Sequence, residues 1–148
     1  MAFFRKISLK IPCRLDCVQM IGQAVKGILA GTTPDKELVY LVELAVCEAV
    51  ANSIKHAHEC RAECSVEIKV VLYTSDIVVQ VIDTGIPLNT EMLKPEHRHD
   101  PLDNFSETEG GRGLFLIQKI MDTVRYKSFA GKNTLTMKKK LPSNRPRS

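Results

Sequence analysis

Two polar side chains, Glu48 and Asn52, interrupt an otherwise apolar segment, ELAVCEAVANSIKHA, at residues 43–57. In an α-helix, residues four apart lie on the same face, one turn above the other. Burying an unpaired carboxylate or carboxamide is costly, so this face is expected to bind something polar. The carboxylate of Glu48 can accept a proton, and the amide oxygen of Asn52 can hold a hard cation such as Mg²⁺.

Two basic residues follow on the same predicted helix. Lys55 stands seven residues after Glu48, which returns it to the same face and would let it meet a phosphate. His56 stands four residues after Asn52 and would flank the same site. Both residues also lie at the helix end, where a solvated basic side chain is equally expected.

A glycine-rich stretch, Glu109-Gly110-Gly111-Arg112-Gly113-Leu114, opens a later helix. Backbone N–H groups at a helix N-terminus attract phosphate, and glycines allow close approach. Arg112 adds a positive charge. A glycine cluster alone would suit a flexible loop equally well. Together with Glu48 and Asn52, however, it indicates a nucleotide site.

Two further segments complete the predicted site. The run VIDTGIP ends a predicted strand with Asp83, whose carboxylate can accept a hydrogen bond from an exocyclic amine such as that of adenine. Gly85 would let the backbone pass close to a base. Asn133-Thr134, in a predicted hairpin, would form an outer wall. Each segment alone is an ordinary turn, so the prediction rests on their combination.

Hydrophobic periodicity predicts the elements that position these residues. The expected strands are 3–11, 65–73, 76–83, 124–129 and 134–141. The expected helices are 15–30, a long one from Thr33 to about residue 57, and 114–122. In the long helix, Thr33-Pro34-Asp35 is interpreted as N-cap, first-turn proline and first-turn acid.

The order of these elements indicates the fold class. Strands 65–73 and 76–83 predict one hairpin, and the last two strands predict a second one around residues 130–133. The order β-α-α-β-β-loop-α-β-β predicts an α+β two-layer sandwich, with a mixed, mostly antiparallel sheet covered by helices on one face. The stretch 84–112 has little periodicity, which is typical of a functional or disordered loop.

Composition indicates one ordinary globular domain. The chain has 148 residues, 44% of them hydrophobic, and we assign residues 1–141 to the domain and 142–148 to a basic, flexible tail. Much of the excess positive charge behind the net +4 lies near the C-terminus, at Lys138, Lys139, Lys140, Arg145 and Arg147, which favours a solvated terminus over a nucleic-acid contact. No apolar run reaches the roughly 20 residues of a membrane span, and the charged start MAFFRKISLK does not resemble a signal peptide. A cytoplasmic location is therefore expected.

The cysteines predict free thiols. Five is an odd number, which argues against a complete disulfide framework. Cys13/Cys17 and Cys60/Cys64 each have CxxxC spacing, with His56 and His58 near the second pair, so a zinc site is conceivable. Structural zinc sites usually have tighter spacing with a matching second half, so reduced thiols are favoured.

The order and spacing of the four motifs resemble a known family. EAVANSIKHA, DTGIP, GGRGLFLIQKIMD and NTLTMKK look like the N, G1, G2 and G3 boxes of the Bergerat-fold ATPases, the gyrase, chaperone, histidine-kinase and mismatch-repair superfamily. The resemblance covers residues 7 to about 140. Within that superfamily, the chain is most similar to the stand-alone serine-protein kinase anti-sigma factors of bacteria.

The resemblance implies a role for each matching residue. Glu48 matches the general base, Asn52 the Mg²⁺ ligand, and Asp83 the adenine-binding aspartate, with Gly85 beside it. Gly111 and Gly113 match the hinge glycines at the phosphates, with Arg112 and Leu114 next to them. Thr134 matches the threonine of the last box, and loop 88–110 matches the ATP lid. Pro87 stands where many members have a second glycine, and it makes that turn stiffer.

The implied activity is phosphoryl transfer from Mg·ATP to a serine or threonine of an anti-anti-sigma partner of the STAS type. The freed kinase would then hold a sigma factor, and members of the family are commonly homodimers. An ATP-binding anti-sigma switch without transfer and a small ATP hydrolase remain as alternatives. The ATPase half of a sensor histidine kinase is disfavoured, because the chain lacks a preceding helical hairpin with a phospho-accepting histidine.

Overall fold

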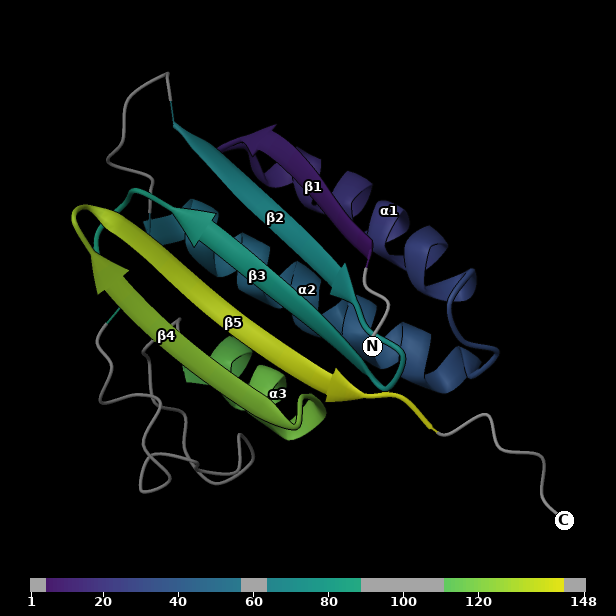
Figure 1. Ribbon diagram of the computed structural model, residues 1–148. Helices are drawn as coiled ribbons and strands as arrows, with labels where there is room; N and C mark the ends of the chain where they lie inside the picture. The colour runs from purple at the N-terminus through teal and green to yellow at the C-terminus, as the bar shows by residue number, and fades with distance from the viewer. Residues whose placement is uncertain (1–4, 57–63, 89–110, 143–148) are drawn as a thin grey trace, which may run out of the picture.

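The computed structural model describes residues 5–56, 64–88 and 111–142 of the chain (Figure 1). The strands are β1 (Arg5–Pro12), β2 (Ser65–Leu72), β3 (Asp76–Asp83), β4 (Thr123–Phe129) and β5 (Lys132–Lys140). The helices are a short 3-10 turn η1 (Leu15–Cys17), α1 (Val18–Ala30), α2 (Lys36–His56) and α3 (Gly111–Ile120). The predicted order of elements is confirmed, with ends that differ by a few residues.

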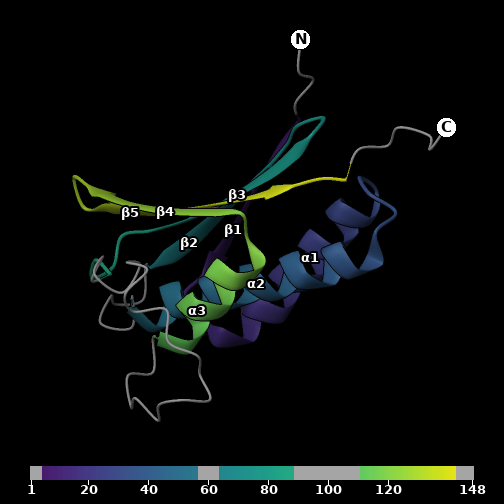
Figure 2. The same cartoon turned by 90° about the horizontal axis from the view of Figure 1, so that it is seen from below.

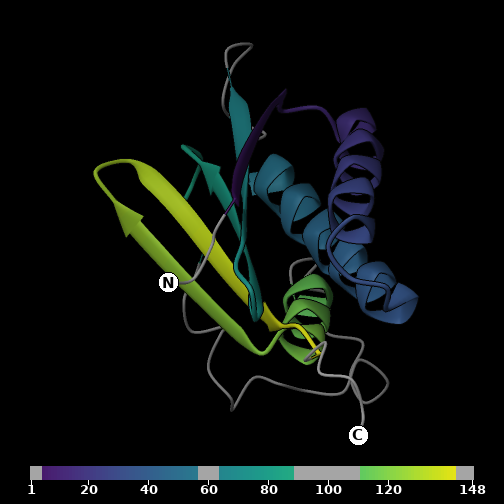
Figure 3. The same cartoon turned by 45° about the vertical axis from the view of Figure 1, so that its right-hand side comes forward.

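The strands form one sheet in the order β1-β2-β3-β5-β4. Each neighbouring pair is antiparallel, so the sheet is fully antiparallel over the described strands rather than mixed. Helices α1, α2 and α3 lie on one face of it, as Figures 2 and 3 show. The predicted two-layer α+β sandwich is therefore confirmed.

The core lies between the sheet and the helices. Strand β2 shows the pattern, because alternate residues are buried and face the helix layer. Helix α2 crosses the middle of this layer and buries Val42, Val46 and Val50 completely. Each fully buried aliphatic side chain contributes about 1.5–3 kcal/mol. This packing holds α2, which carries Glu48 and Asn52, firmly against the sheet.

Helix α2 starts at an aspartate cap. The Asp35 carboxylate accepts a hydrogen bond from the N–H of Leu38 at 3.0 Å, three residues on, which is the geometry of an N-cap. The hydroxyl of Thr33 instead accepts from the N–H of Asp35 at 3.2 Å. The prediction that Thr33 is the N-cap is therefore wrong. Both residue types cap helices, and only the observed hydrogen bonds distinguish them.

The hairpin of β4 and β5 turns through two residues, not four. Ala130 and Gly131 both have positive φ, 52° and 77°. Positive φ at both central residues is the signature of a type I′ turn, whose twist matches that of two-residue hairpins. Strand β5 consequently begins at Lys132, earlier than predicted. Asn133 therefore lies within the strand, directly opposite Asp83.

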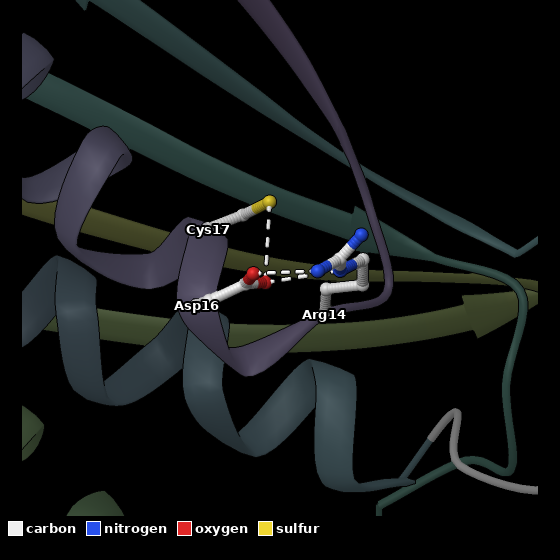
Figure 4. A network of polar contacts seen from close by, with 3 residues as sticks. All are labelled: Arg14, Asp16 and Cys17. Atoms are coloured by element: carbon white, nitrogen blue, oxygen red, sulfur yellow. Dashed lines mark hydrogen bonds and ion pairs between the residues drawn. The ribbon is translucent and has the colours of Figure 1, made fainter.

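The segment between β1 and α1 begins with η1, so the helix predicted from residue 15 is a 3-10 turn followed by α1. Arg14 and Asp16 form an ion pair at 2.7 Å here, and the Cys17 thiol donates to the same carboxylate at 3.8 Å (Figure 4). Both charged side chains are more than 60% exposed, so the pair contributes little to stability. Of the helices in the described part of the chain, none has the length and apolar character needed to cross a bilayer.

Candidate functional site

A cleft lies between α2, α3 and the sheet. Helix α2 lines it with residues spaced at i, i+3, i+4 and i+7, which form a single helix face. Strands β3, β4 and β5 provide the opposite wall, and α3 and the segment after β3 provide the sides. The lining residues are Ala49, Asn52, Ser53, His56, Val81, Asp83, Ile86, Leu88, Leu114, Tyr126 and Leu135. Sequence spacing therefore placed Asn52 and His56 correctly on one face.

The first turn of α3 packs directly on the polar residues of α2. A methyl group built on Gly113 would lie 2.8 Å from Nδ2 of Asn52 and 3.0 Å from Oε2 of Glu48. Real Cβ atoms are essentially never found under 3.0 Å from another heavy atom, so a larger residue at position 113 would displace the Asn52 side chain or the start of α3. The structure thus brings Gly113 of α3 next to Glu48 and Asn52 of α2, although Gly113 follows these two residues by 61 or more positions in the sequence. Leu114, also in α3, is buried beside them.

The other end of the cleft is organised around the carboxylate of Asp83. Its Oδ1 accepts hydrogen bonds from the N–H of Gly85 at 2.9 Å and from Nδ2 of Asn133 at 2.8 Å. Its Oδ2 accepts a hydrogen bond from the hydroxyl of Ser53 on α2. These three donors fix the carboxylate in one orientation. Each carboxylate oxygen has about two lone-pair sites, so Oδ2 keeps a site for a ligand donor.

Asn133 is the strand residue that holds this end together. Its side chain, 1% exposed, also donates to the carbonyl of Gly85 at 2.8 Å and accepts from the hydroxyl of Ser128 at 2.7 Å. Thr134 is paired with Ile82 and points to the face of the sheet away from the helices, and it does not line the cleft. The structure therefore brings Asn133 to the site and leaves Thr134 on the other face.

Tyr126 was not singled out from the sequence. Its hydroxyl accepts a hydrogen bond from the N–H of Leu88 at 2.8 Å, and its ring lines the cleft. Burial raises the pKa of Tyr126 above its ordinary value, the Leu88 hydrogen bond opposes that rise, and the negative charge of Asp83 adds to it. The alternation of β4, which puts Tyr126 on the same face as Val124, is the signal that could have identified it.

Other predicted residues fall outside the cleft or outside the described parts. Lys55 is exposed at the end of α2 and is not among the lining residues. Gly111 starts α3, and Arg112 lies in its first turn. The lid predicted at 88–110 lies, from residue 89 on, outside the described residues, as do Cys60 and His58 of the conceivable zinc site. Ser53, missed in the sequence, belongs to the i, i+3, i+4 stripe that starts at Ala49.

The donors near Gly113 suit a magnesium ion that a nucleotide brings with it. Asn52 offers a carboxamide oxygen and Glu48 a carboxylate, both hard ligands. Within the described ranges, no cluster of three or more His, Cys, Asp or Glu residues could hold a metal alone. Mg²⁺ typically uses one or two protein oxygens together with substrate phosphates, so the two donors fit Mg²⁺ bound to a nucleotide.

Comparison with known proteins places this fold and site in a class. A family model described as the histidine kinase-like ATPase domain matches residues 11–139. The serine-protein kinase RsbW of Listeria monocytogenes is 31% identical over 124 residues, covering 81% of this chain and 78% of the relative. The chain therefore belongs to the histidine kinase-like ATPase family. Within it, the chain falls among the serine-protein kinase anti-sigma factors, so the resemblance found in the sequence is confirmed.

Two solved structures share the fold. The RsbU and RsbW domains of Rv1364c from Mycobacterium tuberculosis superpose with a TM-score of 0.65 at 14% identity, covering 94% of this chain and 34% of that longer one. The SiaB-SiaC complex from Pseudomonas aeruginosa gives 0.59 at 13% identity, covering 91% and 89%. At these identities, the likeness concerns the fold alone.

Proposed function

We propose that this protein is an ATP-dependent protein kinase that phosphorylates a serine or threonine of a STAS-domain anti-anti-sigma partner and also acts as an anti-sigma factor. One observation carries the proposal. A single helix, α2, presents Glu48 and Asn52 to Gly113 at one end of a cleft and Ser53 to Asp83 at the other. The family match and the likeness to the serine-protein kinase RsbW support the same activity.

The Asp83 end is suited to an adenine base. Val81, Ile86 and Leu135 give the cleft apolar walls that would contact the faces of a planar ring. The oriented carboxylate of Asp83 would accept a hydrogen bond from the exocyclic amine. Gly85, held by Asn133 through its carbonyl, keeps the backbone close to that position. Base recognition would therefore depend on a carboxylate that three protein donors keep in place.

The Gly113 end is suited to the phosphates and to the chemistry. Amide groups in the first turn of α3 and the charge of Arg112 would hold phosphate oxygens. Mg²⁺, bound through Asn52 and the phosphates, would offset the charge that develops during transfer. Glu48 would accept the proton of the attacking hydroxyl, a contribution of roughly 10²–10⁴-fold in rate. The contact of Gly113 with both side chains supports this joint role.

The proposed acceptor is a partner protein rather than water. Phosphorylation would add about −1.5 to −2 charges where the partner contacts the kinase, which would eject the partner and free the kinase for a sigma factor. The relative RsbW is named a serine-protein kinase, and the structural neighbour SiaB is solved in complex with SiaC. These two proteins motivate the expectation that a partner protein is the acceptor here. We further propose that the protein acts as a homodimer in the cytoplasm, where ATP and the transcription machinery are present.

A transfer assay tests the proposal. The purified protein is incubated with Mg·[γ-³²P]ATP and a candidate STAS-domain protein, with Glu48→Ala and Asn52→Ala alongside. Label should move to a serine or threonine of the partner, and Glu48→Ala should abolish transfer while largely sparing ATP binding. Asn52→Ala should weaken Mg²⁺-dependent nucleotide binding.

The same assay separates the alternatives. Release of free phosphate without labelled partner would identify a hydrolase in which Glu48 activates water. ATP binding without transfer to any STAS partner would favour a non-catalytic switch. Normal transfer by Glu48→Ala would rule out its role as the base, and absence of ATP binding would contradict the whole site.

A further inference from the structure

The second face of the sheet is covered by none of the described helices. Figure 3 shows α1, α2 and α3 together on one side, with the strands open on the other. The register defines which side chains lie on this open face, because directly paired residues of antiparallel strands point to the same side. Lys6, Val71, Val78, Lys138 and Thr123 form one such row across all five strands.

The open face has an apolar centre. Val71 of β2 and Val78 of β3 are direct partners on the inner strands, and both remain partly exposed. The other inner positions include the hydroxyls of Thr134 and Thr136. An apolar centre within a polar surround is the usual composition of a protein–protein interface. This face therefore has the layout of a docking surface.

Positive charge surrounds that centre. The edge strands contribute Lys6 and Lys10 on β1 and Arg125 and Lys127 on β4, all exposed. The inner strands β2 and β5 add four more cations, Lys69, Lys132, Lys138 and Lys140. Against these eight stand two carboxylates, Glu67 and Asp76.

Few of these cations are neutralised locally. Lys69 lies 3.7 Å from Glu67, and Lys138 lies 3.8 Å from Asp76. The other six have no carboxylate partner among the described residues. Lys127 also lies over the ring of Phe129, which leaves its charge in place. An open sheet face on which six cations have no carboxylate partner among the described residues produces a positive potential that attracts an acidic partner and repels a basic one.

We propose that this open sheet face binds an acidic protein surface. The face is defined by Val71 and Val78 at its centre and by the cations that surround them. The matching partner presents an apolar strip flanked by carboxylates, as an acidic amphipathic helix does. A second copy of this chain fits poorly, because the two sets of cations would face each other. A membrane fits poorly as well, since Phe129 is the one strongly exposed large apolar residue on the described strands of this face.

Nucleic acid is also disfavoured as the occupant. Single strands are bound by aromatic side chains on which bases stack, and Phe129, at the hairpin end, is the aromatic residue that the register puts on this face. The open face lies on the opposite side of the sheet from Asp83 and Asn133. An acidic partner held there would leave the cleft accessible.

A charge-reversal experiment tests this proposal. The probe is a fluorescein-labelled, roughly 20-residue amphipathic helical peptide with a leucine strip flanked by glutamates, and a matched peptide has glutamine at those positions. The face variant carries Lys10→Glu, Arg125→Glu and Lys127→Glu. The control carries Lys26→Glu, Lys36→Glu and Lys119→Glu, which change the net charge equally on exposed helix positions. Binding is measured by anisotropy at low and moderate salt.

The face variant should bind the acidic peptide at least about tenfold more weakly than wild type, with little change in the control. Methyl NMR signals of Val71 and Val78 should shift on binding, and those of Leu114 and Leu135 in the cleft should not. If the charge-reversal variant does not fold, a variant with glutamine at the same three positions should show weaker binding of the acidic peptide for the same reason.

Four results would overturn the proposal. These are an equal loss in the control, equal binding of the glutamine peptide, or methyl shifts confined to the cleft. The fourth is a larger difference between wild type and the face variant in binding to phosphatidylserine vesicles, in binding to single-stranded RNA, or in self-association measured by sedimentation of the protein alone. Vesicles, RNA or self-association would then identify the true occupant.

Discussion

A methyl group at position 113 tests whether the first turn of α3 positions Glu48 and Asn52, the proposed base and the proposed Mg²⁺ ligand. The Cβ of Gly113→Ala would lie 2.8 Å from Nδ2 of Asn52, at least about 0.6 Å closer than the ordinary contact range of 3.4–4 Å. It would also lie 3.0 Å from Oε2 of Glu48. One of the two side chains, or the helix start, must therefore move by that amount.

The expected consequence is catalytic more than structural. Misplacing reacting groups by about 1 Å can cost about 10²-fold in rate, so a shift of about 0.6 Å should lower kcat for phosphoryl transfer by roughly 10- to 100-fold. Overpacking costs about 1–3 kcal/mol, and the better helix propensity of alanine offsets up to about 1 kcal/mol of it. The variant should therefore still fold, with a modest loss of stability.

Gly27→Ala is the matched control. Gly27 is exposed in α1, and its added methyl would meet nothing within 4 Å. It should gain up to about 1 kcal/mol in stability and leave transfer unchanged. Both variants are compared by the initial rate of partner phosphorylation and by the midpoint of thermal unfolding. Wild-type transfer by Gly113→Ala would refute the inference that Gly113 positions Glu48 and Asn52.

Further predictions concern Asn133 and Tyr126, at the Asp83 end of the cleft. Asn133→Ala should weaken ATP binding and lower unfolding stability by about 1–3 kcal/mol, because buried hydrogen-bond partners lose their donor. Asn133→Asp should bind ATP more weakly still, since it puts a second carboxylate beside Asp83. Titration with a fluorescent ATP analogue and urea unfolding measure both effects, and wild-type values for Asn133→Ala would contradict its positioning role. Tyr126→Phe should lose about 1 kcal/mol, because the N–H of Leu88 loses its acceptor. The pKa of Tyr126 is raised in the folded state. The contribution of the neutral Tyr126 hydroxyl to the free energy of unfolding is therefore complete below about pH 10, and it is lost as the pH rises past the folded-state pKa. Urea unfolding between pH 8 and 11 should show that decline in wild type and a smaller one in Tyr126→Phe; identical pH dependence would show that Tyr126 does not cause it.

Local signals were enough to predict the elements and the helix-borne part of the site. Helical spacing put Asn52 and His56 on one face, and both line the cleft. Alternation and turn residues identified both hairpins. The same local rules could not choose between Thr33 and Asp35 as the cap of α2, because both types accept the required hydrogen bond and their positions differ by two residues.

The strand-borne part of the site depended on register, which local patterns do not specify. The two-residue turn starts β5 at Lys132, so Asn133 becomes part of the β3–β5 ladder; because the shift is two residues, the face on which each β5 side chain lies is unchanged. Asn133 thereby faces Asp83 across the β3–β5 pair, and Thr134 faces outward beside Lys127. The same alternation that gives the cleft its asparagine gives the open face its threonines and cations. Sequence motifs therefore identify the residues of this hairpin, and the alternation of β5 indicates which of them face the cleft, but only the observed turn places Asn133 within the strand and opposite Asp83.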